Sequence, residues 1–142
     1  MKLSIASDHA GFRLKTQLAD FLRAQGHELL DHGAESEASC DYPDFARAVA
    51  ADVASGAARF GVLVCSSGIG VSIAANRVRC VRAAVCLNED IAEFSRRHND
   101  ANIICLGQKY VTTVMAEKFL RIFLATDFEG GRHQRRVEKI EG

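Results

Sequence analysis

Short runs of apolar residues recur along the chain, and longer stretches with helical spacing separate them. The apolar runs are 3–6, 27–31, 60–65, 81–86 and 102–107. Each is short and rich in Val, Ile and Leu, which is typical of parallel strands covered on both faces. The stretches with helical spacing are 12–25, 43–56, 69–77, 88–98 and 111–124. The pattern therefore predicts strands and helices in regular alternation.

Residues that begin and end helices fit this division. Gly26 and Gly56 follow two of the helical stretches, and Pro43 opens the second of them. Asn-Gly and Asp-Gly pairs, which favour hairpins, are absent. We therefore predict one α/β domain over residues 1–142, a three-layer α/β/α sandwich with a Rossmann-like, mainly parallel sheet of about five strands.

Composition and charge exclude several classes of protein. The 142 residues are 48% hydrophobic and 25% charged, with 18 basic and 18 acidic side chains. Because these charges balance, the chain has no net electrostatic attraction for nucleic acid or membranes, and we expect neither as a partner. Any site for an anion must therefore come from a local group of residues. No signal-peptide core or membrane-length apolar run is present, and the five cysteines lack zinc-type spacing. We expect a reduced, cytoplasmic protein without a metal site or a cofactor.

The ends of the predicted strands are the first place to look for a site, because open parallel sheets bind ligands beyond their carboxyl ends. Polar and reactive groups follow four of the five predicted strands. They are Ser7-Asp8-His9, Cys65-Ser66-Ser67, Cys86-Leu87-Asn88 and Gly107-Gln108-Lys109. We expect the functional site at this rim.

The segment "CSSGIG" (65–70) places a thiol where a strand passes into a helix. Its two glycines allow a tight turn that points successive N–H groups inward, and a helix N-terminus attracts anions and favours a thiolate. The alternative is a buried strand-end cysteine beside a glycine turn. A Walker-type loop would require lysine at position 71 and a cysteine phosphatase loop would require arginine there, whereas the residue is Val71.

Other polar residues have both a chemical and a structural interpretation. Asp8 can accept sugar hydroxyls or cap a helix, and His98 can transfer protons or lie solvated at a helix end. Arg132 and Arg136 share a helical face suited to phosphate, whereas Arg135 points elsewhere. The strongly apolar stretch 111–124 fits either burial under the sheet or a subunit interface.

Five motifs in this order resemble type B ribose-5-phosphate isomerases and the wider group of allose- and galactose-phosphate isomerases. They are "SDHAGF", "DYPDFA", "CSSGIGVSIAAN", "RRHNDANI" and "EGGRHQRRV", and they span essentially the whole chain. The resemblance implies a metal-free aldose–ketose isomerase that works as a homodimer or tetramer on a small phosphorylated sugar. It also implies a site between two subunits, completed by the basic segment 130–142.

The resemblance also implies a role for each matching residue. The catalytic set would be Cys65, His98, Ser67 and Asp8. Cys65 would be the base that moves a proton between C1 and C2, and His98 would assist opening of the furanose ring. Ser67 would poise the thiol or the substrate oxygens. The enediolate would be held by the backbone amides of Ser66, Ser67, Gly68, Ile69 and Gly70.

The remaining matches would bind the substrate. Asp8, Tyr42 and Asn99 would contact sugar hydroxyls. His9, Arg132 and Arg136 would bind the phosphate, with Lys109 at a position where some relatives carry arginine. No carboxylate follows Cys65 as far as Asn76, which favours cysteine over glutamate as the base.

Alternatives remain open at this point. The intact "RHND" and "GRHQ" blocks favour D-ribose 5-phosphate and D-ribulose 5-phosphate as substrate and product, but a tetrose or hexose phosphate would use the same chemistry. A non-catalytic sugar-phosphate sensor would be expected to lack Cys65 or His98, and both are present. A redox thiol protein is disfavoured because no second cysteine lies near Cys65.

Overall fold

The structure, a computed structural model, describes residues 1–142 and contains one five-stranded parallel sheet. The strand order is β2-β1-β3-β5-β4. The strands are β1 (Lys2–Ser7), β2 (Glu28–Asp31), β3 (Phe60–Cys65), β4 (Ala83–Val85) and β5 (Ile103–Gly107). The helices are α1 (Phe12–Ala24), α2 (Tyr42–Ser55), α3 (Ile69–Ala75), α4 (Glu89–Asn99), α5 (Thr113–Ala125) and α6 (Arg132–Glu141), with a short 3₁₀ helix at His9–Gly11.

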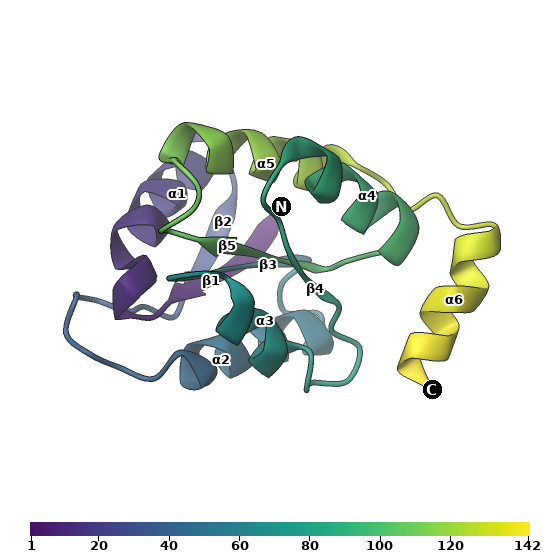
Figure 1. Ribbon diagram of the computed structural model, residues 1–142, viewed down its shortest axis with the longest axis horizontal. Coiled ribbons are helices and arrows are strands. Elements are labelled where there is room, and N and C mark those ends of the chain that lie inside the picture. Colours follow the sequence, from purple (N-terminus) through teal and green to yellow (C-terminus); the bar gives the residue numbers. More distant parts are fainter.

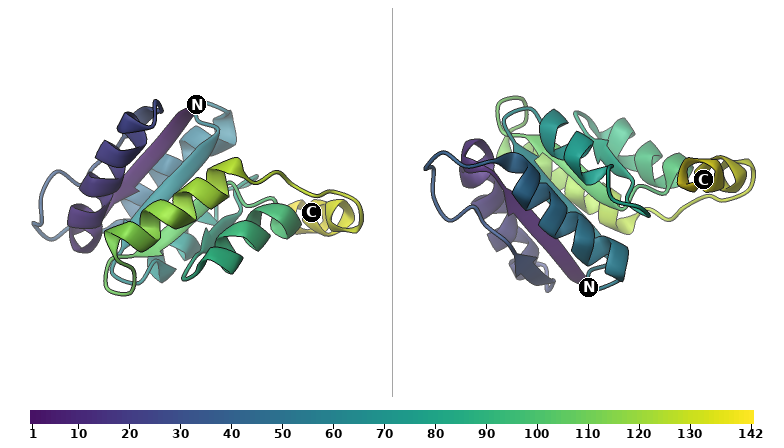
Figure 2. Two further views of the ribbon diagram at one scale, coloured as in Figure 1. Left: turned by 90° about the horizontal axis from the view of Figure 1, so that it is seen from above. Right: turned by 90° about the horizontal axis from the view of Figure 1, so that it is seen from below.

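Helices cover both faces of the sheet, so the predicted three-layer sandwich is confirmed. Helices α1, α4 and α5 lie on one face, and α2 and α3 lie on the other (Figure 1). Each layer contributes its own apolar cluster, centred on residues such as Leu18 and Phe123 above the sheet and Val49 and Val71 below it. Helix α6 stands apart from the sandwich at its far side (Figures 1 and 2).

The predicted helix ends are also confirmed. Pro43 lies in the first turn of α2, and Gly56 ends that helix with a φ of 80°. Gly26, with a φ of 88°, follows the end of α1. A left-handed backbone of this kind is common just past a helix C-terminus. The 3₁₀ turn at His9–Gly11 was not anticipated.

Strand β4 is shorter than the apolar run that predicted it, because it lies at the edge of the sheet. Only Ala83–Val85 pair with β5. The open side of the strand is partly closed by Asn76, whose side-chain amide donates to the Ala83 carbonyl at 2.9 Å and accepts from the Ala83 N–H at 2.8 Å. A side chain thus replaces part of a neighbouring strand and blunts the edge.

Burial against the sheet accounts for most of the apolar stretch in α5. Phe119, Leu120 and Phe123 are buried in the core, and the Phe123 ring packs edge-on against Phe60 with 5.5 Å between centroids. In α5 itself Val114 is exposed, and most other large exposed apolar side chains lie elsewhere, at Ile69, Ile73, Leu87, Ile91, Phe94 and Tyr110. No helix of the chain has the length and apolar character needed to cross a bilayer.

The winding of the chain creates a crevice between β1 and β3. The helix that follows β1 lies on one face of the sheet and the helix that follows β3 lies on the other (Figure 1). Ser7 and Val64 are partners in the parallel register, so Asp8 and Cys65 follow adjacent strands at the same edge. Such a reversal at the carboxyl ends of strands is where open α/β sheets bind ligands.

Candidate active site

The turn after β3 surrounds the Cys65 thiol with backbone. Gly68 adopts a φ of 80°, a left-handed conformation that favours glycine, and α3 begins at the next residue. The Gly68 N–H donates to Cys65 Sγ at 3.1 Å. Cys65 is 5% exposed, so its sulfur lies at the base of the turn. The sulfur is therefore held as a hydrogen-bond acceptor just before the start of α3.

Three of the five amides expected to hold an anion are free to do so. Gly68 donates to the sulfur, and Ile69 donates to the Ser67 hydroxyl at 3.2 Å. The amides of Ser66, Ser67 and Gly70 donate no hydrogen bond to the rest of the chain. Free N–H groups at a helix start form a binding site for negative charge.

Tyr42 lies directly over this turn. A Cβ atom added to Gly70 would come within 2.8 Å of the Tyr42 ring, so only glycine allows the ring this close approach. The backbone of the following strand end is also in contact, because the Lys109 N–H donates to the Ser66 carbonyl at 3.1 Å. The structure therefore brings Tyr42 and Lys109 to the cysteine turn.

Asp8 and His9 stand beside the turn at the end of β1. Asp8 accepts the Gly11 N–H at 3.1 Å, so the capping role is confirmed, and its second carboxylate oxygen has no partner in the chain. His9 Nδ1 accepts the Cys40 N–H at 3.2 Å, so in the neutral ring the proton is on Nε2.

A cavity of about 450 Å³ opens next to these two residues. Its lining comprises Asp8, His9, Cys40, Asp41, Tyr42, Pro43, Asp44 and Arg47. Arg47 was not anticipated from the sequence. Its position four residues after Pro43 on a helix could have indicated it, because that spacing places both residues on one helical face.

The other predicted site residues lie at the opposite end of the sheet. Helix α4 starts beyond the carboxyl end of β4 and runs back, so His98 and Asn99 occupy its last turn beside the start of β5. The five residues of β5 span roughly 16 Å. Arg132 and Arg136 lie on α6, whose main contacts are with α4. One chain therefore does not bring His98, Asn99, Arg132 or Arg136 to Cys65.

Two histidines and a carboxylate cluster at this end. The His98 and His133 rings stack with 4.2 Å between centroids and 11° between planes. One Glu129 oxygen is 3.9 Å from His98 Nε2, the other is 3.9 Å from His133 Nε2, and Arg97 donates to the first at 2.9 Å. Glu129 and His133 were given no role from the sequence, and because Glu129 precedes α6, no helical spacing indicates their contact.

Charge and burial shift the titration of this cluster. Burial and the positive charges of His98 and Arg132 lower the pKa of His133 below its ordinary 6.5. The Arg97 hydrogen bond lowers the pKa of Glu129. At neutral pH the cluster thus combines an uncharged His133 with an ionised Glu129 that can accept hydrogen bonds from either ring.

The donor atoms of His98, Glu129 and His133 lie within 4.8 Å of one another, a spacing that invites a test for a metal. A histidine binds a metal through a lone pair in the plane of its ring. Because the two rings are stacked nearly parallel, these lone pairs run side by side and cannot converge on one ion. The arrangement fits proton sharing better than metal chelation.

Two other cysteines are buried, Cys86 just after β4 and Cys105 in β5. Burial raises the pKa of the Cys86 thiol to about 11 and raises that of Cys105 well above its ordinary 9.0. Both thiols stay protonated at neutral pH, which fits a packing role. All five cysteines are free thiols.

Comparison with known proteins places the chain among sugar-phosphate isomerases. The sequence profile of the family described as Ribose/Galactose Isomerase matches residues 3–140. Ribose-5-phosphate isomerase B of Escherichia coli is 41% identical over 139 residues, which cover 98% of this chain and 93% of that protein.

Two solved structures share the fold over nearly the full length. Ribose-5-phosphate isomerase B of Clostridium thermocellum is 48% identical with a TM-score of 0.98, covering 99% of this chain and 95% of that one. The Mycoplasma genitalium enzyme, solved with bound ribulose 5-phosphate, is 41% identical with a TM-score of 0.94, covering 99% and 93%.

Proposed function

Because the chain belongs to the ribose/galactose isomerase family, we propose that it interconverts D-ribose 5-phosphate and D-ribulose 5-phosphate. The observation that carries this proposal is the turn after β3, where a strand-end thiol accepts an amide hydrogen bond beside three free amides. Removing a proton next to a carbonyl needs a positioned base and fixed donors for the oxyanion that develops. Both are side by side at this turn.

The Cys65 thiolate acts as the base in this mechanism. It takes the proton from C2 of the open-chain aldose and returns it to C1 of the enediolate. The proton of the C2 hydroxyl passes to the oxygen on C1, so the carbonyl moves from C1 to C2. The amides of Ser66, Ser67 and Gly70 stabilise the enediolate oxygens, because they have no other acceptor. The Ser67 hydroxyl, which accepts the Ile69 N–H, keeps its own proton free for a substrate oxygen.

The rest of the substrate is bound by two sets of residues. One set surrounds the turn after β3, and the other comes from α4 and α6 at the amino end of the sheet. Asp8, Tyr42 and Asn99 bind sugar hydroxyls, and His98 transfers the proton that opens the furanose ring. The phosphate is bound by His9, Lys109, Arg132 and Arg136. Holding the phosphate at a distance from the reacting carbons orients the sugar over Cys65.

The site is formed by two copies of the chain. Cys65 and His98 lie at opposite ends of the sheet, so a substrate that touches both must lie between two chains. A twofold axis would complete two such sites at once, because each copy offers both ends. The exposed apolar side chains of α3 and α4, including Ile73, Ile91 and Phe94, are suited to the contact. We propose a homodimer, or a tetramer built from such dimers.

A substrate panel tests the activity. D-ribose 5-phosphate, a tetrose phosphate and a hexose phosphate are assayed with a chelator present, and the highest kcat/KM is expected for the pentose. A higher value for another sugar would reassign the substrate, and loss of turnover with the chelator would contradict a metal-free reaction. If no sugar is turned over, the proposed isomerase activity is wrong and a non-catalytic protein that binds sugar phosphates remains.

Subunit mixing tests the shared site. Cys65→Ala and His98→Asn proteins are each expected to be nearly inactive. If they are unfolded and refolded together, half of the dimers are mixed, and each mixed dimer has one site with both residues intact. Activity should then return to about one quarter of the wild-type value. No recovery, with mixed dimers shown by mass spectrometry, would place both residues in one chain's site.

A further inference from the structure

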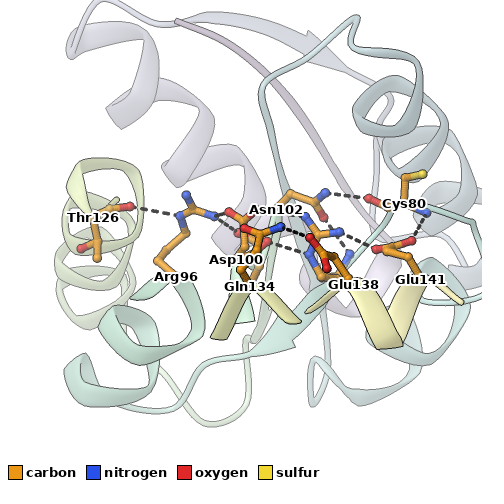
Figure 3. A network of polar contacts seen from close by, with 10 residues as sticks. Cys80, Arg96, Asp100, Asn102, Thr126, Gln134, Glu138 and Glu141 are labelled. Atoms are coloured by element: carbon orange, nitrogen blue, oxygen red, sulfur yellow. Dashed lines mark hydrogen bonds and ion pairs between the residues drawn. The ribbon is translucent and has the colours of Figure 1, made fainter. Parts of the chain in front are cut away.

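A network of polar contacts joins the end of α6 to the body of the protein (Figure 3). We propose that Arg82, Asp100 and Glu141, here called the α6 clamp, hold α6 in the position from which Arg132 and Arg136 bind the phosphate. The inference rests on the proposed function and adds positioning residues to it. None of the three is expected to touch the sugar.

The clamp is built around one arginine. Arg82 Nη1 donates to Glu141, its Nε donates to the Asp100 carbonyl at 2.9 Å, and its Nη2 donates to the Asp100 carboxylate at 3.3 Å. The second oxygen of Glu141 accepts the Cys80 N–H at 3.1 Å. Only 17% of the Arg82 side chain and 26% of the Glu141 side chain are exposed. Partial burial strengthens such charged hydrogen bonds relative to a surface pair.

The body side of the clamp is held firmly. Arg96 donates to the Asp100 carboxylate at 2.8 Å and to the Ala101 carbonyl at 2.6 Å. It also donates to the Thr126 carbonyl at 3.1 Å, and its guanidinium lies over the Phe60 ring at 4.7 Å. Arg96 is 4% exposed, so Asp100 is attached to the protein core. Asp100 can therefore serve as a fixed point for Arg82.

The segment that carries Arg82 is fixed as well. Asn102 accepts the Arg82 N–H at 2.8 Å and donates to the Cys80 carbonyl at 2.8 Å. The Arg82 carbonyl accepts the Asn102 N–H at 2.9 Å. Both partners of Glu141, the Arg82 side chain and the Cys80 amide, are thus in place without α6.

Helix α6 has little else to hold it. Of its ten residues only His133 and Val137 are buried, and both arginines proposed to bind phosphate are exposed. The helix projects beyond the sandwich (Figure 2). A helix this short is marginal by itself in water. His133 packs against His98 in the first half, Val137 is buried in the second half, and in the last turn only Glu141 has side-chain hydrogen bonds to the body.

The clamp therefore acts mainly on Arg136, because this residue is closer than Arg132 to the last turn of the helix. Without Glu141 the last turn would fray, and Arg136 would lose order before Arg132. Phosphate contacts act on the substrate ground state and transition state alike, so their loss raises KM and spares kcat.

Glu141→Ala tests the clamp, and Glu138→Ala is the matched control. Glu138 is on the same helix, and its side chain pairs only with Gln134 of that helix. Alanine favours helix, and a carboxylate at a helix C-terminus is unfavourable, so an unclamped α6 would become more ordered on losing Glu141. The clamp predicts the opposite: amide hydrogen exchange in α6 about tenfold faster in Glu141→Ala, and unchanged in the control.

The kinetic readout separates positioning from general stability. For Glu141→Ala we expect KM and the inhibition constant of inorganic phosphate to rise about fivefold, with kcat within about twofold of wild type. Equal exchange in the two variants would overturn the clamp, whether or not the protein is an isomerase. Faster exchange with an unchanged phosphate constant would overturn its role in phosphate binding. A wild-type protein without isomerase activity would overturn the proposed function, and exchange and phosphate binding would still decide on the clamp.

Discussion

The two ends of the sheet position their functional groups in different ways. At the carboxyl end, Cys65 and the free amides belong to one turn of a few consecutive residues, and backbone contacts hold them. At the amino end, His98, Glu129 and His133 come from three segments, and stacking and ion pairs hold them. The first arrangement depends on chain geometry, and the second depends on charge.

The difference teaches which half of the site should respond to which perturbation. Backbone amides do not titrate, so the cysteine turn should keep its shape over a wide pH range. The histidine cluster contains two titratable rings beside a carboxylate. Helix α6, which carries His133, is attached to the body by the ion pair of Arg82 and Glu141. Substitutions in the first region should therefore alter proton transfer between C1 and C2, and those in the second should alter ring opening, phosphate binding and pH dependence.

The largest expected effect is on turnover. Cys65→Ala should lower kcat by about a thousandfold and leave KM nearly unchanged, because it removes the base without removing binding groups. Cys86→Ala is the control, since Cys86 also ends a strand run but its raised pKa keeps it protonated. Steady-state kinetics on both variants measures the difference. Similar losses in the two would mean that Cys65 acts through packing.

A smaller effect is expected on substrate affinity. Arg136→Ala should raise KM about tenfold with little change in kcat, because a charged hydrogen bond to the phosphate is lost. Arg135→Ala, one residue earlier on the same helix, should change neither constant, because its side chain is exposed and has no partner. The two variants are compared by their KM for ribose 5-phosphate. An unaltered KM for Arg136→Ala would mean that Arg136 is a solvent-exposed side chain that does not bind the phosphate.

The smallest effect concerns pH and stability. The pKa of His133 in the folded chain is below its ordinary 6.5, so below that pH the unfolded chain binds more protons. The free energy of unfolding should therefore fall as the pH falls from about 6.5 toward the pKa of the folded state. Urea denaturation of wild type and His133→Asn at about pH 8 and about pH 5 measures this contribution. A wild-type protein that loses no more stability than the variant would contradict it.

Much of the carboxyl end could be predicted from the sequence. The strand ends, the glycine turn at residues 68 and 70, and the capping by Asp8 all depend on residues a few positions apart. What the sequence could not indicate is that Tyr42 covers Gly70, a contact between two helices.

The amino end was harder to predict because its contacts join distant segments. Arg82 and Glu141 are 59 residues apart, and Arg97 and Glu129 are 32 apart. In the sequence, Glu129, Glu138 and Glu141 are equivalent carboxylates in a charged tail, and only one of them meets Arg82. The apolar surplus of α5 was equally ambiguous until Phe119 and Phe123 were seen in the core.

The sequence by itself determined the order of strands and helices along the chain, the α/β class and the turn around Cys65, because these follow from hydrophobic period and from backbone preferences of neighbouring residues. The tertiary structure decided that the candidate site residues form two groups at opposite ends of the sheet, and that ion pairs attach α6. The physical reason is that such contacts depend on how packed elements place charged side chains from remote parts of the chain, which no local pattern encodes.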